Sequence, residues 1–376
     1  MNENLTNFFE AVQRIWRRFV NGVRSLFVSA FEGTLRLTES RKCPYCLSDI
    51  INRSSRLDGE GKVITCQNCN HDLPSDFFKH KGGVVALVGG PDTGKTTFIT
   101  VLLRLLQTNT AISRMLKLHS NIIDRDVRRG YINRVNRLFD RLEILPTTEV
   151  NSEEARFPIV VKLKHNQGDR SRVMYLSLFD TPGEEFFEID KLTQVHPHIN
   201  NADAIIFLID PMNIRPIYEE VLKAGSQDEF ANIREYELED EFVEYEIMEN
   251  LSEEFRRKGK ATSGGKISIP VAFCLSKADL LSSFTSVYIP DEIDNAMLDK
   301  KGVFDEIRLT SEDVSTLLEE KHPSLLNNIE GLFQKYNFFP VAPIGKNPSS
   351  EVIDGAPEPK GVLYPLVWIL DQLKFI

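Results

Sequence analysis

The hydrophobic pattern divides the chain into three parts. Residues 1–35 carry apolar side chains at helical spacing, residues 36–80 contain two pairs of cysteines, and residues 81–376 alternate short apolar runs with helical patterns. Parallel strands that are buried on both faces read as nearly continuous apolar runs, so this alternation predicts a mainly parallel sheet covered by helices. We expect an N-terminal helix, a small cysteine module and one large α/β domain.

Individual elements of the large domain follow from the same pattern. The run VVALV at 84–88 predicts a buried strand, and the apolar spacing over 96–106 predicts a helix directly after it. Residues 157–165 and 172–180 alternate in hydrophobicity on either side of an NQGD turn, so they predict a hairpin that adds one antiparallel strand. Further strands are expected at 202–210, 269–276 and 338–343, with a closing helix at 363–373.

The negative charge of the chain is concentrated in one block. The formal net charge is −10, and the segment from Asp228 to Glu254 holds twelve acidic residues and one basic residue, a local balance of −11. Because the remainder is nearly neutral, a uniformly basic protein that coats nucleic acid is disfavoured. We expect a solvated helical insertion, at about 214–266, between two strands. Docking of a basic partner on this insertion is the functional alternative.

Four cysteines have the spacing of metal ligands. Cys43 and Cys46 form one C-x-x-C pair, Cys66 and Cys69 form a second, and nineteen residues separate the pairs. Two such turns can place four thiolates tetrahedrally around Zn²⁺, and a module of this size has too little core to fold unsupported. We therefore expect a structural zinc ribbon, in which His71 is a substitute ligand that the four cysteines make unnecessary.

Nucleic-acid binding is the alternative for this module, and its charge pattern disfavours it. No aromatic ladder for stacking bases lies between the two pairs. The fifth cysteine, Cys274, lies in the apolar run IPVAFCL and is expected to be a buried core thiol. The basic residues between the pairs are offset by acidic ones: Arg53, Arg56 and Lys62 against Asp49, Asp58 and Glu60.

Residues 5–31 predict an amphipathic helix. At about 100° per residue the aromatic and aliphatic side chains share one arc, and Arg14, Arg17, Arg18 and Arg24 occupy the opposite side. Such a helix can lie on an anionic membrane surface or dock on a protein, and we favour docking. Without an apolar run of about 18 residues or a secretory cleavage site, the chain is expected to be cytoplasmic, with peripheral membrane contact as the alternative.

The stretch VVALVGGPDTGKTT carries a complete phosphate-loop pattern between a predicted strand and a predicted helix. Its glycines let backbone N–H groups converge on phosphate oxygens, and the start of the helix adds its positive dipole end. Lys95 is expected to reach the β- and γ-phosphates, and the Thr96 hydroxyl to ligate Mg²⁺. The expected nucleotide-binding loop consists of Gly89, Pro91, Asp92, Thr93, Gly94, Lys95, Thr96 and Thr97.

Two further segments are expected beside the phosphates. Asp180 ends a predicted strand in the sequence DTPG, where it can hold the water shell of Mg²⁺, and Gly183 lets a backbone N–H approach a γ-phosphate. Between the first helix and the hairpin, Thr148 is expected to ligate Mg²⁺ when the γ-phosphate is present, with Thr147 as a close alternative.

The tetrapeptide Ser276-Lys277-Ala278-Asp279 follows another predicted strand. The Asp279 carboxylate can accept two N–H donors from the edge of guanine, a donor pair that adenine lacks. The alkyl stem of Lys277 can cover the face of the base. These two residues therefore predict GTP rather than ATP as the nucleotide.

The ordered motifs resemble those of the translation-factor-related GTPases, which share a Ras-like core. The resemblance covers about residues 81–376 and implies a P-loop GTPase fold that binds GTP and GDP with Mg²⁺. It also implies that the backbone of Ala342 meets the guanine carbonyl, although the serine usual before that alanine is missing. Ser276 stands where Asn or Thr is usual. Glu184 stands where relatives commonly use glutamine to orient water, so slow hydrolysis is expected.

A narrower resemblance is to the bacterial double-GTPase group. It rests on the cysteine module before the core, the NADAIIFLIDP strand and the LVWIL helix. It implies a protein partner or a second GTPase, in a conflict or defence system. The expected function is a Mg²⁺-dependent GTP switch that hydrolyses slowly and is stimulated by a partner. An ATPase of the same fold, and a non-hydrolysing scaffold with structural nucleotide, are the alternatives.

Overall fold

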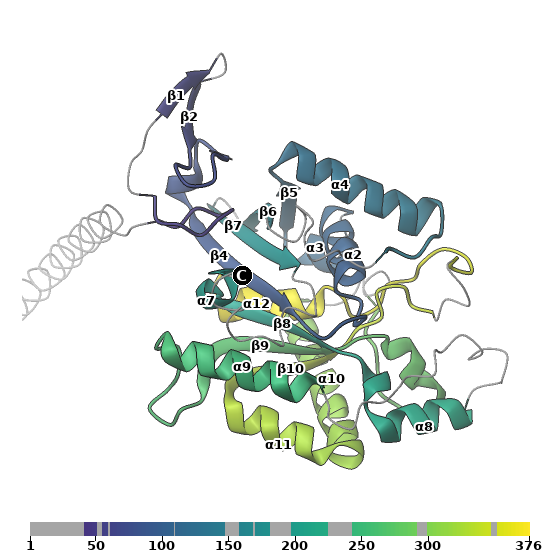
Figure 1. Ribbon diagram of the computed structural model, residues 1–376. Coiled ribbons are helices and arrows are strands. Elements are labelled where there is room, and N and C mark those ends of the chain that lie inside the picture. Colours follow the sequence, from purple (N-terminus) through teal and green to yellow (C-terminus); the bar gives the residue numbers. More distant parts are fainter. Residues whose placement is uncertain are drawn as a thin grey trace, which may run out of the picture.

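A seven-stranded sheet forms the centre of the molecule. Its strands are β4 (Lys81–Val88), β5 (Leu118–Ile122), β6 (Ile159–Gln167), β7 (Arg170–Asp180), β8 (Ala204–Ile209), β9 (Ile267–Leu275) and β10 (Phe333–Pro340). The spatial order is β10-β9-β8-β4-β7-β6-β5 (Figure 1). β6 pairs antiparallel with both of its neighbours, and the other pairs are parallel, which confirms the predicted sheet. The computed structural model describes residues 41–50, 55–58, 61–108, 110–146, 158–167, 170–180, 197–224, 243–291, 299–346 and 352–376.

The side chains of the central strands alternate between two buried cores. In β4, Val85 and Leu87 enter one core, whereas Ala86 and Val88 enter the other. β8 and β9 alternate in the same way. Successive side chains of a strand point to opposite faces, so a strand with both faces covered needs apolar residues at every position. The continuous apolar runs of the sequence therefore marked these strands correctly.

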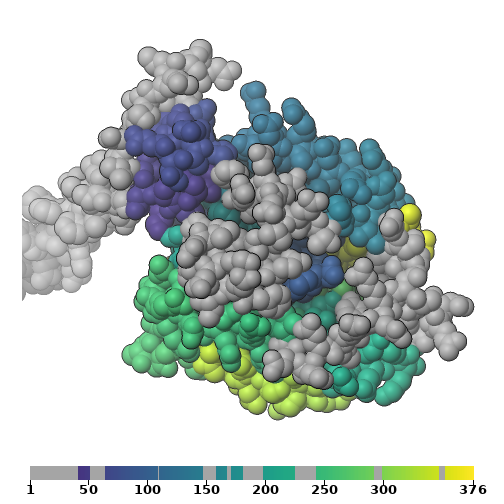
Figure 2. Space-filling model, viewed as in Figure 1, coloured from purple at the N-terminus to yellow at the C-terminus, as the bar shows by residue number. Residues whose placement is uncertain are grey.

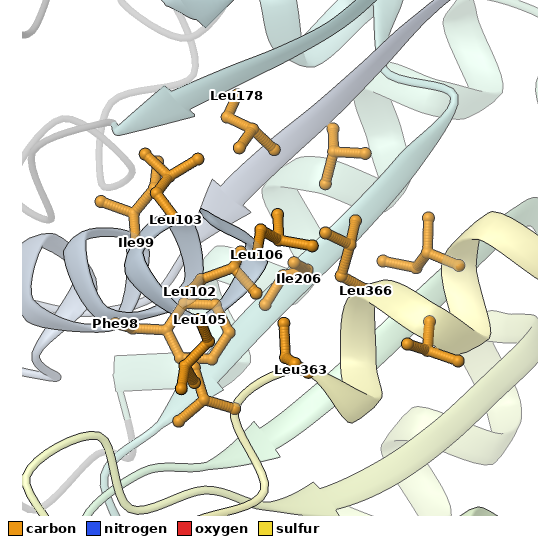
Figure 3. Close-up of a cluster of buried hydrophobic side chains, with 14 of the residues drawn as sticks. Phe98, Ile99, Leu102, Leu103, Leu105, Leu106, Leu178, Ile206, Leu363 and Leu366 are labelled. Atoms are coloured by element: carbon orange, nitrogen blue, oxygen red, sulfur yellow. The ribbon is translucent and has the colours of Figure 1, made fainter. Parts of the chain in front are cut away.

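On the first face, helices from both ends of the domain pack together. Leu102 and Leu106 of the helix that follows β4 lie beside Ile206 of β8 and Leu366 of the closing helix (Figure 3). The predicted elements at 96–106 and 363–373 are thus confirmed as helices of one core. The helices of this face are α2 (Lys95–Gln107), α3 (Ala111–Met115), α4 (Arg125–Val135, continued by a π-helical turn, Asn136–Asp140) and α12 (Tyr364–Gln372).

The second face is covered by α7 (Pro197–Asn201), α8 (Arg215–Ala224), α9 (Val243–Arg257) and α11 (Pro323–Leu332). Figure 1 shows α2 and α4 on one side of the sheet and α9 and α11 on the other. The long helix α10 (Lys300–Lys321) packs on the edge strand β10 and contributes to both cores. Short 3-10 helices, η4 (Pro211–Asn213) and η5 (Ala278–Ser283), follow β8 and β9.

Part of the acidic block differs from the expected solvated insertion. α9 contains the end of this block, and one face of it is fully buried through Ile247, Met248, Leu251 and Phe255. Apolar residues three and four positions apart lie on one helix face, so α9 packs against the sheet while most of its acidic residues face solvent. The described part of the block is therefore a covering helix of the domain. Residues 225–242 lie outside the described residues.

The cysteine module forms its own small sheet and docks on the hairpin. Its strands β1 (Ser55–Asp58), β2 (Gly61–Thr65) and β3 (Asp72–Leu73) pair antiparallel. Tyr45 and Phe77 of the module share a buried cluster with Val160 of β6 and Tyr175 of β7. Over the hairpin, the second face of the sheet is thus covered by the module. In Figure 2 the module forms a purple lobe at one side of the molecule. A 3-10 turn, η1 (Phe77–Lys79), leads from the module into β4.

The predicted amphipathic helix at 5–31 lies outside the described residues. Among the residues that the structure does describe, no helix is long and apolar enough to cross a membrane. The predicted core thiol, Cys274, is fully buried in β9.

Candidate functional site

The loop between β4 and α2 has the backbone of a phosphate-binding loop. Gly89 has a φ of 155°, and a Cβ placed there would lie 2.6 Å from the carbonyl oxygen of Leu208, so only glycine fits. Gly94, with a φ of 83°, precedes α2, and no side chain caps that end of the helix. A helix start that lacks a side-chain cap and lies in a glycine-rich loop is a ready anion site.

Lys95 and Thr93 hold the loop together from inside. The Lys95 ammonium donates to the carbonyl oxygens of Gly89 and Gly90, at 2.9 and 2.6 Å. The Thr93 hydroxyl donates to the Gly90 carbonyl at 3.0 Å, and both side chains are buried. These contacts place the Lys95 charge at the loop itself. Of the other predicted loop residues, Pro91 and Asp92 are exposed, whereas Thr96 and Thr97 are partly buried in the first turn of α2.

Asp180 ends β7 beside this loop. In the parallel pairing of β4 with β7, Asp180 is the register partner of Leu87, two residues before Gly89. Its side chain is buried. The structure thus brings Asp180 and the phosphate loop to the same edge of the sheet. Four other predicted site residues, Thr147, Thr148, Gly183 and Glu184, lie outside the described residues.

The loop after β9 is tied to the loop after β8. Lys277 has a left-handed backbone, with a φ of 49°, and its ammonium makes an ion pair with the Asp210 carboxylate at 2.5 Å. Asp210, whose side chain is 2% exposed, also accepts from the backbone N–H of Met212 and so caps η4. The Ser276 hydroxyl donates to the carbonyl of Ile209 at 3.2 Å. Sequence reasoning missed Asp210, although its place at the end of the apolar run ADAIIFLID was a signal.

Asp279 lies in the first turn of η5 and is partly buried. The pKa of its carboxyl is raised, because burial, aided by the charge of Asp210, outweighs the hydrogen bond from its own backbone N–H and the charges of Lys277 and Lys360. A buried carboxylate has lost hydrogen bonds to water, so a ligand that donates two N–H groups to it stabilises its charged form. The position of Asp279 next to Lys277 therefore suits recognition of a base edge.

The backbone of Ala342, which the family resemblance places at the guanine carbonyl, pairs with Lys360. Its backbone N–H donates to the carbonyl of Lys360 at 2.9 Å, and Lys360 donates back to Ala342 at 3.0 Å. The neighbouring N–H of Val341 donates to Leu275, and Pro343 has no N–H at all. A donor already used within the protein cannot also serve a guanine carbonyl without breaking that bridge. In this structure the Ala342 N–H is thus bonded within the protein.

Glu244 is a second buried carboxyl at this edge that the sequence did not mark. It is the second residue of α9, is fully buried, and accepts a hydrogen bond from the Asn213 side chain at 3.2 Å. The pKa of Glu244 is raised to about 7, because burial and the charge of Asp210 outweigh the hydrogen bonds from its own backbone N–H and from Asn213 and the charge of Lys95. A glutamate inside an acidic block gives no signal in sequence that it will be buried.

The four paired cysteines form a separate candidate metal centre. The sulfur atoms of Cys43, Cys46, Cys66 and Cys69 all lie within 4.8 Å of one another. Two of the distances, Cys43 to Cys69 and Cys46 to Cys66, are 3.7 Å. With Zn–S bonds of about 2.3 Å, the edge of a tetrahedral site is about 3.8 Å. The four thiol groups therefore fit a tetrahedral metal such as Zn²⁺.

The two cysteine turns have matching hydrogen bonds. Leu47 N–H donates to the Cys43 carbonyl and Asn70 N–H to the Cys66 carbonyl, each at 2.9 Å. Both Leu47 and Asn70 have a φ of 59°. His71 is not a member of the cluster; its ring stacks on Tyr45 at 4.4 Å between centroids. This agrees with the expectation that the four cysteines suffice.

Comparison with known protein families decides the class of the large domain. The family described as Double-GTPase 2 matches residues 83–323, which is more than half of the chain. The chain belongs to the Double-GTPase 2 family. This membership confirms the resemblance found in the sequence, and it agrees with the P-loop GTPase topology of the sheet. The large domain thus has the fold of a GTP-binding switch.

Solved structures similar to this Double-GTPase 2 protein are also GTPases. The Arl6 (BBS3) small GTPase from Trypanosoma brucei, bound to the analogue GppNp, is 11% identical; the match covers 78% of this chain and 98% of that one, with a TM-score of 0.30. The FeoB G-domain from Methanococcus jannaschii is 13% identical, with coverages of 78% and 99% and a TM-score of 0.29. At these scores neither structure supports an argument about the site.

One curated relative of this Double-GTPase 2 protein has a described role. The candidate ESX-1 scaffolding and assembly protein SaeC from Mycolicibacterium smegmatis is 24% identical over 163 residues. The match covers 42% of this chain and 41% of SaeC, so the chain spans less than half the length of this relative.

Proposed function

We propose that the protein is a Mg²⁺-dependent molecular switch that binds GTP and hydrolyses it slowly. One observation carries this proposal: the strands β4, β7, β8, β9 and β10 are parallel, so the phosphate loop, Asp180 and the Lys277–Asp279 loop all lie at the carboxyl edge of one sheet. Ligands of open α/β sheets bind at this edge. The family match supports a GTPase in particular.

The phosphate half of the proposed site uses residues of β4, α2 and β7. The backbone N–H groups of the loop from Gly89 to Thr97, apart from Pro91, surround the phosphate oxygens, and Lys95 neutralises charge on the β- and γ-phosphates. Thr96 and Asp180 would hold Mg²⁺, which neutralises phosphate charge when bound. The buried Asp180 carboxylate beside the loop fits a hard cation that prefers oxygen ligands.

The base half uses the loop after β9. Asp279 accepts the two guanine donors, and the stem of Lys277 covers the base. The ion pair with Asp210 fixes the Lys277 head group, which keeps its stem in one place. Since Ala342 donates to Lys360, the specificity for guanine rests mainly on Asp279 in this proposal.

Displacement of a fluorescent GDP analogue from the purified protein tests the nucleotide choice. With Mg²⁺ present, unlabelled GTP and GDP are expected to displace the analogue at micromolar or lower concentration, and ATP at concentrations about a hundredfold higher or more. Removing Mg²⁺ with a chelator is expected to weaken GTP binding. If ATP competes as well as GTP, the protein is an ATPase of the same fold. If nucleotide binds without turnover under any condition, the scaffold alternative stands.

Conversion between the two states is proposed to depend on residues beyond the described ranges. Thr148, with Thr147 as the alternative, would contact Mg²⁺ in the GTP state, and the Gly183 N–H would meet the γ-phosphate. Glu184 places a carboxylate where a water-orienting glutamine serves relatives. A second negative charge near the γ-phosphate opposes hydrolysis, so we propose that a protein partner or second GTPase stimulates it.

The cysteine module is proposed to be a structural zinc ribbon. The four thiols fit tetrahedral Zn²⁺, and the module shares a buried cluster with the hairpin β6–β7. Its inner face is thus used for contact with the large domain. This arrangement favours a structural role over nucleic-acid binding.

A scaffold context for the switch is supported by SaeC, which is described as a candidate scaffolding and assembly protein. We propose a cytoplasmic protein that engages a protein partner in its GTP state, with a bacterial conflict or defence system as the context implied by the sequence resemblance. Residues 5–31 would dock on a partner or on a membrane. Binding of the wild type, but not of Trp16→Glu, to anionic liposomes would select the membrane.

A further inference from the structure

The start of α9 packs directly on the phosphate loop. A Cβ placed at Gly90 would lie 3.6 Å from Cγ1 of Val243, the first residue of α9. The next residue, Glu244, is fully buried. A carboxyl group thus lies in the interior beside the loop that would hold the phosphates, on an element that the known loop motifs do not include.

The Glu244 carboxyl is only half satisfied. Its Oε1 accepts from Asn213 Nδ2 at 3.2 Å, and its Oε2 is buried with no hydrogen-bond partner among the described residues. Two charged groups influence it electrostatically: the Lys95 ammonium from the loop and the Asp210 carboxylate from the end of β8. Asn213 belongs to η4, the turn that Asp210 caps. Glu244 therefore connects the phosphate half of the edge with the base half.

A buried carboxyl of this kind responds to a bound anion. An ionised Glu244 attracts Lys95 and repels phosphate, whereas a protonated Glu244 does neither. A triphosphate at the loop therefore favours the protonated form. Binding then takes up a proton from solvent onto the Glu244 carboxyl, and release of the nucleotide returns it.

We propose that Glu244 is a positioning residue of the phosphate loop that couples nucleotide binding to the uptake of up to one proton. The proposal rests on the proposed function, in that it requires a triphosphate at this loop. Lys95 is the group through which Glu244 acts: it is shared between the carboxylate and the phosphates when Glu244 is ionised, and it is left to the phosphates when Glu244 is protonated. Nucleotide affinity then falls as pH rises above neutrality.

The size of the effect follows from linkage. Since burial already raises the pKa of Glu244 to about 7, the nucleotide-free protein loses this proton as pH rises through that value. A bound anion raises the pKa of Glu244 further. Between the pKa of the free protein and that of the bound protein, the nucleotide affinity falls about tenfold per pH unit. The total loss of affinity is therefore about tenfold for each unit by which the anion raises the pKa. Below about pH 6 the affinity no longer depends on this group.

Titration of GTP with Mg²⁺ between about pH 6 and pH 8.5 tests the proposal with three proteins. The wild type is expected to bind about tenfold more weakly at the upper end. Glu244→Gln, which keeps the shape and is always neutral, is expected to bind as the wild type does at low pH and to lose this dependence. Glu246→Gln is the matched control, because Glu246 is exposed on the same turn of α9, and it should follow the wild type. The nucleotide itself also titrates with pH, but this contribution is the same for all three proteins.

Binding heats measured at about pH 7 in two buffers of different ionisation enthalpy give the proton count directly. The wild type is expected to take up a fraction of a proton more than Glu244→Gln does. A Glu244→Gln protein that retains the wild-type pH profile, or a wild type with no pH dependence, overturns the role of Glu244 and leaves the GTP switch intact. If none of the three proteins binds GTP at any pH, the proposed function fails and this inference fails with it. Should Glu244→Gln not fold, a wild-type GTP affinity that does not fall between about pH 7 and pH 8.5 overturns the role of Glu244.

Discussion

The Ser177 hydroxyl donates a hydrogen bond to the backbone carbonyl of Pro44 at 2.7 Å. Pro44 lies inside the first C-x-x-C turn of the cysteine module, and Ser177 lies in β7, three residues before Asp180. A second contact joins the Lys42 ammonium to the Asn201 side chain of α7. The module is thus bonded directly to the strand that ends at the phosphate site. Order in the cysteine turns and order in β7 support each other.

Loss of the metal centre is therefore expected to weaken the large domain as well as the module. In the double variant Cys46→Ser, Cys69→Ser we expect stoichiometric zinc to be lost, the module to become sensitive to protease, and the melting temperature to fall by several degrees. A structural zinc site supplies much of the folding free energy of so small a module. Metal analysis, limited proteolysis and thermal unfolding check these three outcomes.

Ser177→Ala is the matched control for that experiment. It removes the hydrogen bond to Pro44 and leaves every cysteine in place, so zinc should stay bound while stability falls by about 1 kcal/mol. Freshly purified wild type that contains no zinc would contradict the metal assignment, and a protease-resistant module in the double variant would contradict its structural role.

Asp76 is expected to stabilise the docking of the module on the hairpin at neutral pH, and this stabilisation is expected to be lost in strong acid. It accepts from Lys162 at 2.6 Å and from the Tyr175 hydroxyl, and it pairs with His80 at 3.2 Å. Burial raises the pKa of Asp76, but the bonds from Lys162 and Tyr175 and the charges of Lys162 and His80 outweigh it and lower the pKa to about 2. The unfolded pKa is about 3.9, so the stabilisation is present above about pH 4 and is lost as pH falls towards 2.

Thermal unfolding of the wild type and Asp76→Asn checks this expectation. At about pH 6 the variant should melt roughly 2–4 °C lower, which corresponds to about 1 kcal/mol for a partly exposed pair. The difference should fall to about half at about pH 3 and approach zero only at about pH 2 and below. A gap that stays constant across this range would show that the loss is one of packing and not of charge.

The sequence predicted the elements whose residues are buried on both sides and missed those whose pattern is mixed. β4, β8 and β9 are apolar throughout, so their runs stand out. β5 (Leu118–Ile122) buries only its first and last residues. Its middle residues are polar, so the segment lacks the apolar pattern that predicts a strand. The buried residues of α10 are divided between two cores, so they do not form the single apolar face that predicts a helix.

The candidate site was predictable where a local motif defines it. The phosphate loop, Asp180 and the Lys277–Asp279 loop each carry their chemistry within a few neighbouring residues. Asp210 was missed because its partner, Lys277, is 67 positions away in the chain. The pairing of Ala342 with Lys360 was not predicted, because it is a tertiary contact that no local pattern reports.

Slow intrinsic hydrolysis is expected from Glu184. Its carboxylate stands where a glutamine would orient water, and a negative charge beside the γ-phosphate is unfavourable. We expect single-turnover hydrolysis by the isolated chain to be slow and a partner that supplies an arginine to raise the rate by about 10³ or more. Glu184→Gln is expected to hydrolyse faster than the wild type at unchanged GTP affinity. Rapid turnover that Glu184→Ala leaves unchanged would contradict this expectation.

The choice of guanine is expected to rest on Asp279. In Asp279→Asn an amide N–H replaces one acceptor oxygen, so it opposes the guanine amino group and matches the carbonyl that xanthine carries in its place. A mispaired polar edge costs about 1–3 kcal/mol, or roughly ten- to a hundredfold in affinity. We expect weaker GTP binding, a gain in binding of xanthosine triphosphate, and little change for ATP, all measured by competition against a fluorescent nucleotide.

Lys95→Ala is the comparison that separates the base from the phosphates. Lys95 lies at the phosphate loop and is not expected to contact the base. Its loss should therefore weaken the binding of GTP and of xanthosine triphosphate alike, in both the wild-type and the Asp279→Asn background. The two substitutions act on different parts of the nucleotide and their effects should add. If Asp279→Asn leaves GTP affinity intact while Lys95→Ala abolishes it, a triphosphate binds at the loop but Asp279 does not read its base.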